Sequence, residues 1–169
     1  SVLATAFSTN GVATDALTFN VVEDVVVATG VITATDAGDL VTLDKQTSVK
    51  VKVDATQITG TYAELEHVYV SGKAGFSNLG NEAVTFTGTT TAARVDSILK
   101  ATTGVVTAAA GVIGAETAEE LVRNLKNAKN DALALEITSG SVANAADLKA
   151  LDAKTTTIID ADSIAKLIG

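Results

Sequence analysis

Residues 147–155 read DLKALDAKT and residues 39–47 read DLVTLDKQT, so the same five residues recur at the same spacing in both stretches. Each stretch leads into a β-rich segment with a matching end, VDA at residues 53–55 and IDA at residues 159–161. A weaker middle copy covers residues 95–113. Repetition of this kind predicts a supersecondary unit that stacks on its own copies.

Helix-start signals place a helix in each unit. Five residues that can cap a helix precede an apolar stripe: Asp36, Thr61, Thr91, Thr117 and Asn144. Four of them have an acid three residues later, at the capping-box spacing: Asp39, Glu64, Glu120 and Asp147. The fourth residue after every cap is apolar: Leu40, Leu65, Val95, Leu121 and Leu148. This register predicts five amphipathic helices.

Segments rich in β-branched residues alternate with these helices. They predict strands within residues 48–59, 83–89, 104–113, 133–139 and 156–159. One strand and one helix in every 25–30 residues predicts βα units joined by parallel, right-handed crossovers. Two architectures fit, an α/β solenoid and a closed or doubly wound α/β domain. The regular period favours the parallel strand–helix repeat of a solenoid.

The chain is expected to have two parts. Residues 1–35 contain strand-like runs at 17–22, 25–28 and 31–34, and they predict a β-rich segment that caps the stack or takes part in assembly. Residues 36–169 form the expected βα repeat domain, with units that start near residues 36, 61, 91, 117 and 144. The glycine-rich stretch at residues 71–81 predicts a loop.

Composition excludes several classes of function. The chain has no cysteine and only one histidine, His67, which excludes disulfide scaffolds, thiolate metal sites and multi-histidine metal sites. A net charge of −8 repels nucleic-acid phosphates. No apolar run reaches the roughly 18 residues of a membrane span. Neither a Gly-x-Ser-x-Gly elbow nor a phosphate loop occurs, so we expect no enzyme and no required cofactor.

Closely spaced acids are the candidate metal ligands. Asp36 and Asp39 form one such group and Asp160 and Asp162 another, and carboxylate oxygens in turns can bind Ca²⁺. The alternative is that these acids cap helices and solvate the surface, which we favour because no EF-hand loop is present.

Three aromatic residues are the candidate binding residues. Tyr62, Tyr69 and Phe76 lie within 15 residues of one another, next to the glycine-rich loop, and could stack on a glycan. The alternative, which we favour, is that they pack against neighbouring units.

The repeats resemble segments of very large secreted or S-layer-like surface proteins of cyanobacteria and other marine bacteria. The resemblance covers residues 36–169 and rests on ADLKALDAKTT at 146–156 and ITGTYAEL at 58–65. It implies a secreted or cell-surface location and no catalytic residues. Many such proteins are exported by type I systems and carry calcium-binding nonapeptides, which this chain lacks.

We therefore expect a structural component of an extracellular assembly, such as a spacer, lattice or filament subunit. It would self-associate as a homopolymer or lattice when the exposed end of one stack is covered by another chain. The alternative function is a glycan-binding or adhesion module without catalysis.

Overall fold

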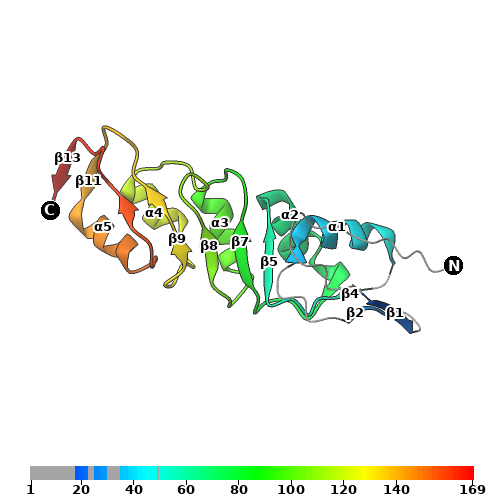
Figure 1. The fold of residues 1–169 in the computed structure, drawn as a ribbon. Coiled ribbons are helices and arrows are strands. Elements are labelled where there is room, and N and C mark those ends of the chain that lie inside the picture. The colour runs from blue at the N-terminus through cyan, green and yellow to red at the C-terminus, as the bar shows by residue number, and fades with distance from the viewer. Residues whose placement is uncertain (1–17, 23–24, 30–34, 49) are drawn as a thin grey trace.

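A computed structural model of the chain describes residues 18–22, 25–29, 35–48 and 50–169. These residues form an elongated row of alternating strands and helices (Figure 1). The first described strands lie at one end of the row and the last strand lies at the other.

Five α-helices are present in the described part of the chain. They are α1 (Ala37–Gln46), α2 (Tyr62–Glu66), α3 (Ala92–Leu99), α4 (Ala118–Asn124) and α5 (Ala145–Asp152). Their N-caps are the five predicted residues, Asp36, Thr61, Thr91, Thr117 and Asn144. All five predicted helix starts are therefore confirmed. Helix α2 continues into a π-helical turn, η1 (His67–Ser71), and a 3₁₀ turn, η2 (Lys73–Gly75), follows.

Side chains at the caps explain why the helices begin where they do. The backbone amide and hydroxyl of Thr117 both donate to the Glu120 carboxylate, at 3.0 and 2.8 Å. These hydrogen bonds, the backbone one above all, hold the pKa of Glu120 below its usual value. Thr61 and Glu64 make the same pair of bonds, both at 2.8 Å. The capping boxes read from the sequence thus fold as local units.

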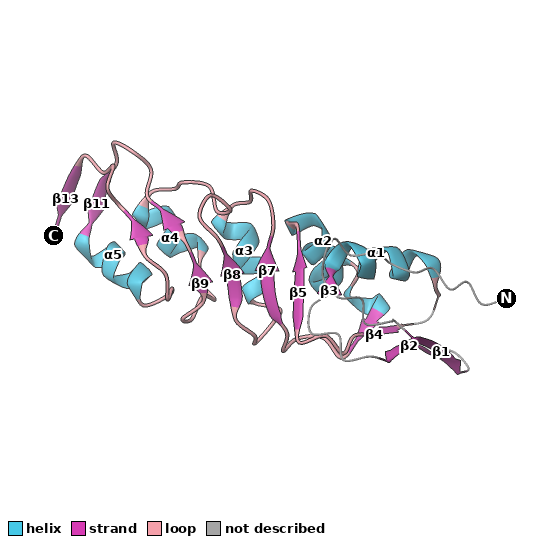
Figure 2. Ribbon diagram, viewed as in Figure 1, coloured by secondary structure: helices cyan, strands magenta, loops and turns pink. Residues whose placement is uncertain are grey.

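A five-stranded parallel sheet runs along the row. Its strands are β3 (Thr35–Asp36), β5 (Gln57–Gly60), β7 (Ala83–Phe86), β8 (Val106–Ala108) and β9 (Ala132–Leu133), in that spatial order. Every neighbouring pair is parallel. The strands lie in the sheet in the same order as in the sequence. After each helix, the chain therefore adds a new strand next to the previous strand of the sheet (Figure 2).

Three smaller sheets are also present among the described residues. In one, β1 (Thr18–Val22) pairs antiparallel with β2 (Val25–Thr29), and β2, β4 (Val51–Lys52) and β6 (Phe76–Ser77) then pair in parallel. The other two are the parallel pairs β10 (Leu135–Glu136) with β12 (Ile159–Asp160) and β11 (Val142–Asn144) with β13 (Lys166–Ile168). Parallel pairing therefore continues beyond the five-stranded sheet.

Parallel partners lie a nearly constant distance apart in the sequence. Every described parallel pair joins residues 21–26 positions apart, from Glu116 with Ile137 at the short end to Ile58 with Val84 at the long end. We call one such length of chain, with its helix or turn and its strands, a coil. Successive coils pair with one another in the described part of the chain.

The core lies between the helices and the strands. Strands β5, β7 and β8 bury alternate residues, as expected for a sheet with one covered face. Four of the predicted helix positions are buried in a single apolar cluster: Leu40, Leu65, Val95 and Leu121. The fifth, Leu148, is half-buried and packs against the same cluster. The amphipathic stripe read from the sequence is thus the face that joins neighbouring coils.

The predicted strands are confirmed in part. The expectation of a mixed α/β fold with alternating strands and parallel pairing holds. However, β6 lies inside the stretch predicted as a loop, and β11 and β13 fall outside every predicted strand segment. Strands β1 and β2 coincide with two predicted N-terminal runs, whereas the run at residues 31–34 lies outside the described residues. No described helix is both long enough and apolar enough to cross a membrane.

Candidate functional site

The four candidate calcium ligands lie in two groups far apart along the row (Figure 1). Asp36 caps α1, where its carboxylate accepts the amide hydrogen of Gly38 at 2.7 Å. Asp39 lies in the first turn of α1, and burial, with the nearby charge of Asp36, raises the pKa of its carboxyl. Asp160 accepts the amide hydrogen of Asp162 at 3.1 Å. Within the described residues, no three His, Cys, Asp or Glu side chains gather where they could hold a metal.

The three candidate aromatic residues do not share one surface. Tyr69 and Phe76 are buried, and Tyr69 donates its hydroxyl hydrogen to Glu82 at 3.1 Å. Tyr62 is half-buried, and the guanidinium carbon of Arg94 lies 4.9 Å from the centre of its ring. Of the three, only Tyr62 is placed to meet a ligand, and it already makes a cation–π contact.

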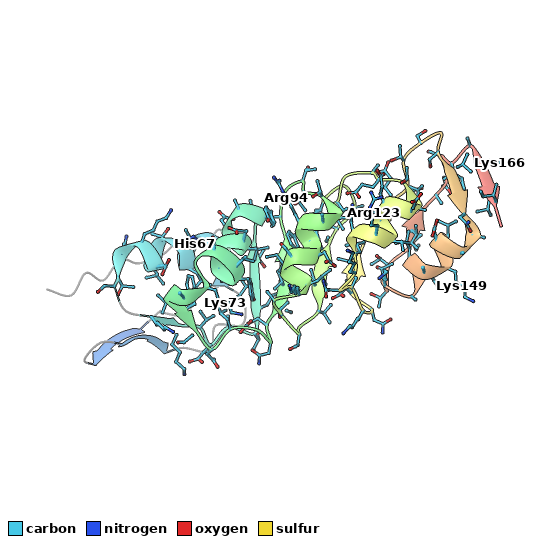
Figure 3. All side chains as sticks on the ribbon, turned by 180° about the vertical axis from the view of Figure 1, so that it is seen from behind. His67, Lys73, Arg94, Arg123, Lys149 and Lys166 are labelled. Carbon is cyan, nitrogen blue, oxygen red and sulfur yellow. The ribbon has the colours of Figure 1, made fainter. Side chains whose placement is uncertain are left out.

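The single histidine joins two coils. His67 in η1 places Nε2 2.8 Å from the Asp44 carboxylate in α1, and its ring meets Phe76 edge-on at 6.3 Å. A Cβ on Gly72 would lie 2.5 Å from Nε2, and a Cβ on Gly75 would lie 1.9 Å from the Asp44 carboxylate. Two glycines therefore make room for the pair. Figure 3 shows His67 on the helical side of the row.

A buried carboxylate that the sequence reading did not single out lies at the start of β7. Glu82 is 2 % exposed and accepts three hydrogen bonds, from the Tyr69 hydroxyl at 3.1 Å and from the amides of Gly80 at 2.8 Å and Asn81 at 3.2 Å. Burial, together with this carboxylate, raises the pKa of Tyr69 well above its usual range. The carboxylate thus satisfies polar groups in the core.

Asp131 repeats this arrangement at the start of β9. It is also buried, and it accepts the amide hydrogens of Val106 and Lys129, each at 2.8 Å. Glu82 and Asp131 both bind the amide two residues before them, and Asp131 also reaches the preceding coil. In the sequence, both carboxylates begin the same pattern, an acid followed by alanine and then an apolar residue, at residues 82–84 and 131–133.

Buried threonines complete these contacts from the following coil. The hydroxyl of Thr102 donates to the Glu82 carbonyl at 2.8 Å, and the hydroxyl of Thr155 donates to the Asp131 carbonyl at 3.1 Å. Both threonines lie three residues after the end of a helix. The repeated Thr of the sequence motif therefore ties one coil to the coil before it.

A shallow apolar groove crosses three coils near β10 and β12. Its volume is about 500 Å³, and its lining includes Ala110, Ala134, Leu135, Thr157 and Ile158. The small alanines on two coils and the larger Ile158 on the third create the hollow. Its lining contains one charged residue, Asp160, whose side chain already accepts a hydrogen bond from the backbone.

The end of the row at β13 exposes apolar side chains. Leu167 is 54 % exposed, Ile168 is 43 % exposed, and Ile158 in the same coil is 88 % exposed. Among the described residues, β13 pairs with β11 alone, so one edge of the strand has unpaired backbone groups. The exposed side chains here are of the same apolar types as those buried in the core.

Comparisons of the chain with protein-family models, with curated proteins and with solved structures give no match. The assignment of a function therefore depends on the contacts and surfaces described above. Most of the polar side chains described above either hydrogen-bond to the backbone or link two neighbouring coils.

Proposed function

We propose that the chain is a structural segment of an extracellular or cell-surface assembly, such as a lattice, a filament or an adhesin spacer. The observation that carries the proposal is the parallel pairing of residues 21–26 positions apart, which extends from β2 to β13. We interpret this as an α/β solenoid, in which each coil buries the apolar face of its neighbour. A solenoid is a linear object and suits a role as spacer or lattice element.

Contacts between coils support a rigid spacer. The buried Asp131 carboxylate accepts from the Val106 amide of the preceding coil at 2.8 Å. Buried Thr102 and Thr155 donate to the backbone carbonyls of Glu82 and Asp131, in the coil before each, at 2.8 and 3.1 Å. Buried hydrogen bonds to charged groups are stronger than neutral ones and fix geometry as well as register. Sliding or tilting of one coil on the next would break them.

The proposal involves no catalytic step and no required cofactor. The side chains that general acid–base chemistry would use are committed to structure: Glu82 and Asp131 bind backbone amides, and His67 binds Asp44. A reaction centre needs titratable groups that face a substrate. Glu82 and Asp131 face the protein interior, and the partly exposed His67 is paired with Asp44.

The resemblance of residues 36–169 to repeats of S-layer-like surface proteins supports a secreted or cell-surface location and self-association as the partner interaction. The net charge of −8 opposes nonspecific clustering, so association would need a specific contact.

Electron microscopy and diffraction test the proposal. Concentrated, purified chain should form filaments or sheets, and oriented material should diffract at a spacing of about 4.8 Å along the long axis, the separation of neighbouring strands. Sedimentation velocity over a hundredfold range of concentration should show growth beyond the monomer. A chain that stays monomeric throughout, with no ordered particles, would contradict the structural role.

Two further experiments test whether assembly depends on calcium and whether the chain binds glycans. Assembly in excess chelator and in millimolar Ca²⁺ should be equal, because Asp36 and Asp160 already accept backbone hydrogen bonds. The alternative function, glycan binding, now depends on Tyr62 and Arg94, since Tyr69 and Phe76 are buried. A glycan-array signal that disappears in Tyr62→Ala, and not in Val70→Ala, would favour that alternative.

A further inference from the structure

The row has two long edges, one where the helices begin and one where they end. Neighbouring strands of the five-stranded sheet are parallel, so each helix between them starts at one edge and ends at the other. The parallel bridge between Asp131 and Thr155 extends this pattern past α5. Figure 3 shows Arg94, in the first turn of α3, and Lys73, after η1, on opposite long edges.

The edge where the helices begin is acidic. We call it the start edge, and it comprises residues 36–39, 61–64, 91–94, 117–120 and 144–147. These segments contain six acids and a single basic residue, Arg94, which lies against the Tyr62 ring. Glu119 is exposed and forms no ion pair with the described residues. The start edge therefore carries a negative stripe.

The edge where the helices end is basic. We call it the end edge, and it comprises residues 45–48, 72–75, 100–104, 126–130 and 153–156. These segments contain six lysines and no acid. Three of the lysines keep one register, because each lies nine residues after an N-cap, at position 36, 91 or 117: Lys45, Lys100 and Lys126.

Most lysines of the end edge are available to a partner. Five are exposed and form no ion pair with the described residues: Lys45, Lys73, Lys100, Lys126 and Lys129. The sixth, Lys154, donates to the Leu125 carbonyl at 2.7 Å. Two acids adjoin this edge, Asp44, which is paired with His67, and Asp152, which is exposed. The end edge therefore presents a positive stripe with little internal neutralisation.

The two stripes are too far apart to neutralise each other within one copy. A helix of eight residues, such as α3 or α5, is about 12 Å long. Charges in physiological salt are screened over about 8 Å. Acids at helix starts and lysines at helix ends also stabilise the helices themselves, which explains why every coil repeats the arrangement.

The shared repeat makes the edges complementary along their length. Each coil that contains a helix supplies one helix start and one helix end, so both stripes advance by the same step. When one lysine of the end edge meets an acid of another copy, the following coils come into register as well. Single exposed ion pairs contribute little, so a contact needs several of them together. A two-fold contact through one edge would instead bring like charges together.

We propose that copies of this chain associate side by side, with the end edge of one copy on the start edge of the next. Lysines such as Lys100 and Lys126 then lie beside acids such as Glu119 and Asp147 of the neighbouring copy. This inference rests on the proposed structural role, because it names the contact that joins rows into a sheet. Each added copy leaves one edge of either kind free, so the sheet grows without closing.

The salt dependence of the unmodified chain tests the nature of the contact. The screening length falls from about 10 Å in 0.1 M NaCl to about 3 Å in 1 M NaCl. The concentration needed for side-by-side association, measured by sedimentation velocity, should therefore rise at least tenfold between these conditions. Electron microscopy should show sheets at low salt and separate rows at high salt. Association that is equal or stronger in 1 M NaCl would overturn the proposal.

Exchange of charge between the edges tests which residues meet. Lys100→Glu with Lys126→Glu, and separately Glu119→Lys with Asp147→Lys, should each raise the association concentration at least tenfold. An equal mixture of the two double variants should associate more readily than either alone, because the exchanged charges face one another again. Lys100→Arg with Lys126→Arg keeps the charge and is the matched control. No recovery in the mixture, or an equal loss in the arginine control, would overturn the proposal.

The same measurements separate this inference from the proposed function. If the chain assembles and both charge-reversed variants assemble equally well, growth uses another surface: the edge contact fails and the structural role stands. If the unmodified chain stays monomeric at both salt concentrations, the structural role fails as well. Binding of dextran sulfate without self-association would assign the end edge to an anionic partner and overturn the proposal. Circular dichroism shows whether each variant is folded, and the salt series decides the matter without any variant.

Discussion

The Glu116 carboxylate accepts a hydrogen bond from the backbone amide of Ala92 at 3.1 Å, across the boundary between two coils. Ala92 is the first residue of α3, whose N-cap Thr91 makes no side-chain capping bond and is followed by Arg94 where the other caps have an acid. The second Glu116 oxygen accepts from the side chain of Asn124 at 2.8 Å. Helix α3 is thus capped by the coil that follows it.

Replacement of Glu116 tests this cap between coils. Glu116→Ala should lower the free energy of unfolding by about 1–2 kcal/mol, because the Ala92 amide and the Asn124 side chain both lose their acceptor. Glu116→Gln, which keeps one acceptor oxygen, should lose less. Urea denaturation measures the change, and Glu136→Ala, at an exposed side chain, is the matched control. Equal losses at Glu116 and Glu136 would show that the cap contributes nothing.

The buried Tyr69 phenol predicts a loss of stability at high pH. Its pKa is raised in the folded state by burial and by Glu82, from an ordinary value of 10.0. The unfolded chain releases this proton at the ordinary value, so the stability linked to Tyr69 is present in full below pH 10 and is lost as the pH rises above it. Thermal unfolding between pH 8 and 11 should show this decline, and Tyr69→Phe should reduce it. An unchanged slope in Tyr69→Phe would place the titrating group elsewhere.

Gly72 and His67 form a steric pair. Gly72→Ala should destabilise the fold by about 1–3 kcal/mol, because the new Cβ would lie 2.5 Å from His67 Nε2 and push the ring away from Asp44. In a His67→Ala background the same substitution should cost little, since the obstructing ring is gone. A double-mutant cycle by chemical denaturation measures the coupling. Additive losses would mean that the His67 ring is not the obstacle to a side chain at this position.

Gly104 marks a close approach of two coils. A Cβ at this position would lie 2.1 Å from the backbone oxygen of Glu82, and backbone cannot move aside as a side-chain tip can. Gly104→Ala should therefore cost several kcal/mol, on the order of the largest single-residue effects. Gly114→Ala is the control, because its Cβ would meet only Thr90 at an ordinary 3.8 Å. The midpoint of thermal unfolding should fall sharply in the first variant and little in the second.

Helix starts were readable from the sequence because their signals are local. A cap, an acid three residues on and an apolar residue four residues on lie within one turn, and the Thr117–Glu120 unit folds as that pattern predicts. The parallel pairing also followed, because a helix between two strands forces a crossover. These features could be predicted because they depend on residues that are close together in the sequence.

Other features depend on neighbours in space and were missed. Strands β11 and β13 are three residues long and pair with each other across 24 positions, so their strand character comes from the partner. Glu82 and Asp131 each begin an acid-Ala-apolar motif, at residues 82–84 and 131–133, but a sequence cannot show that a turn folds over a carboxylate. For Tyr69 and Phe76 the sequence left two interpretations open, and both side chains are buried, in agreement with the favoured one, that they pack inside the protein.

The pairing of β10 with β12 and of β11 with β13 across 24 residues has a mechanical consequence. Strands β1 and β13 lie at opposite ends of the row, so a pulling force on the two ends acts along its length (Figure 1). A coil at one end can then peel away while the rest stays folded, and each released coil adds roughly 80 Å of extended chain. Under tension strong enough to release a coil, the molecule would therefore lengthen in steps of about one coil.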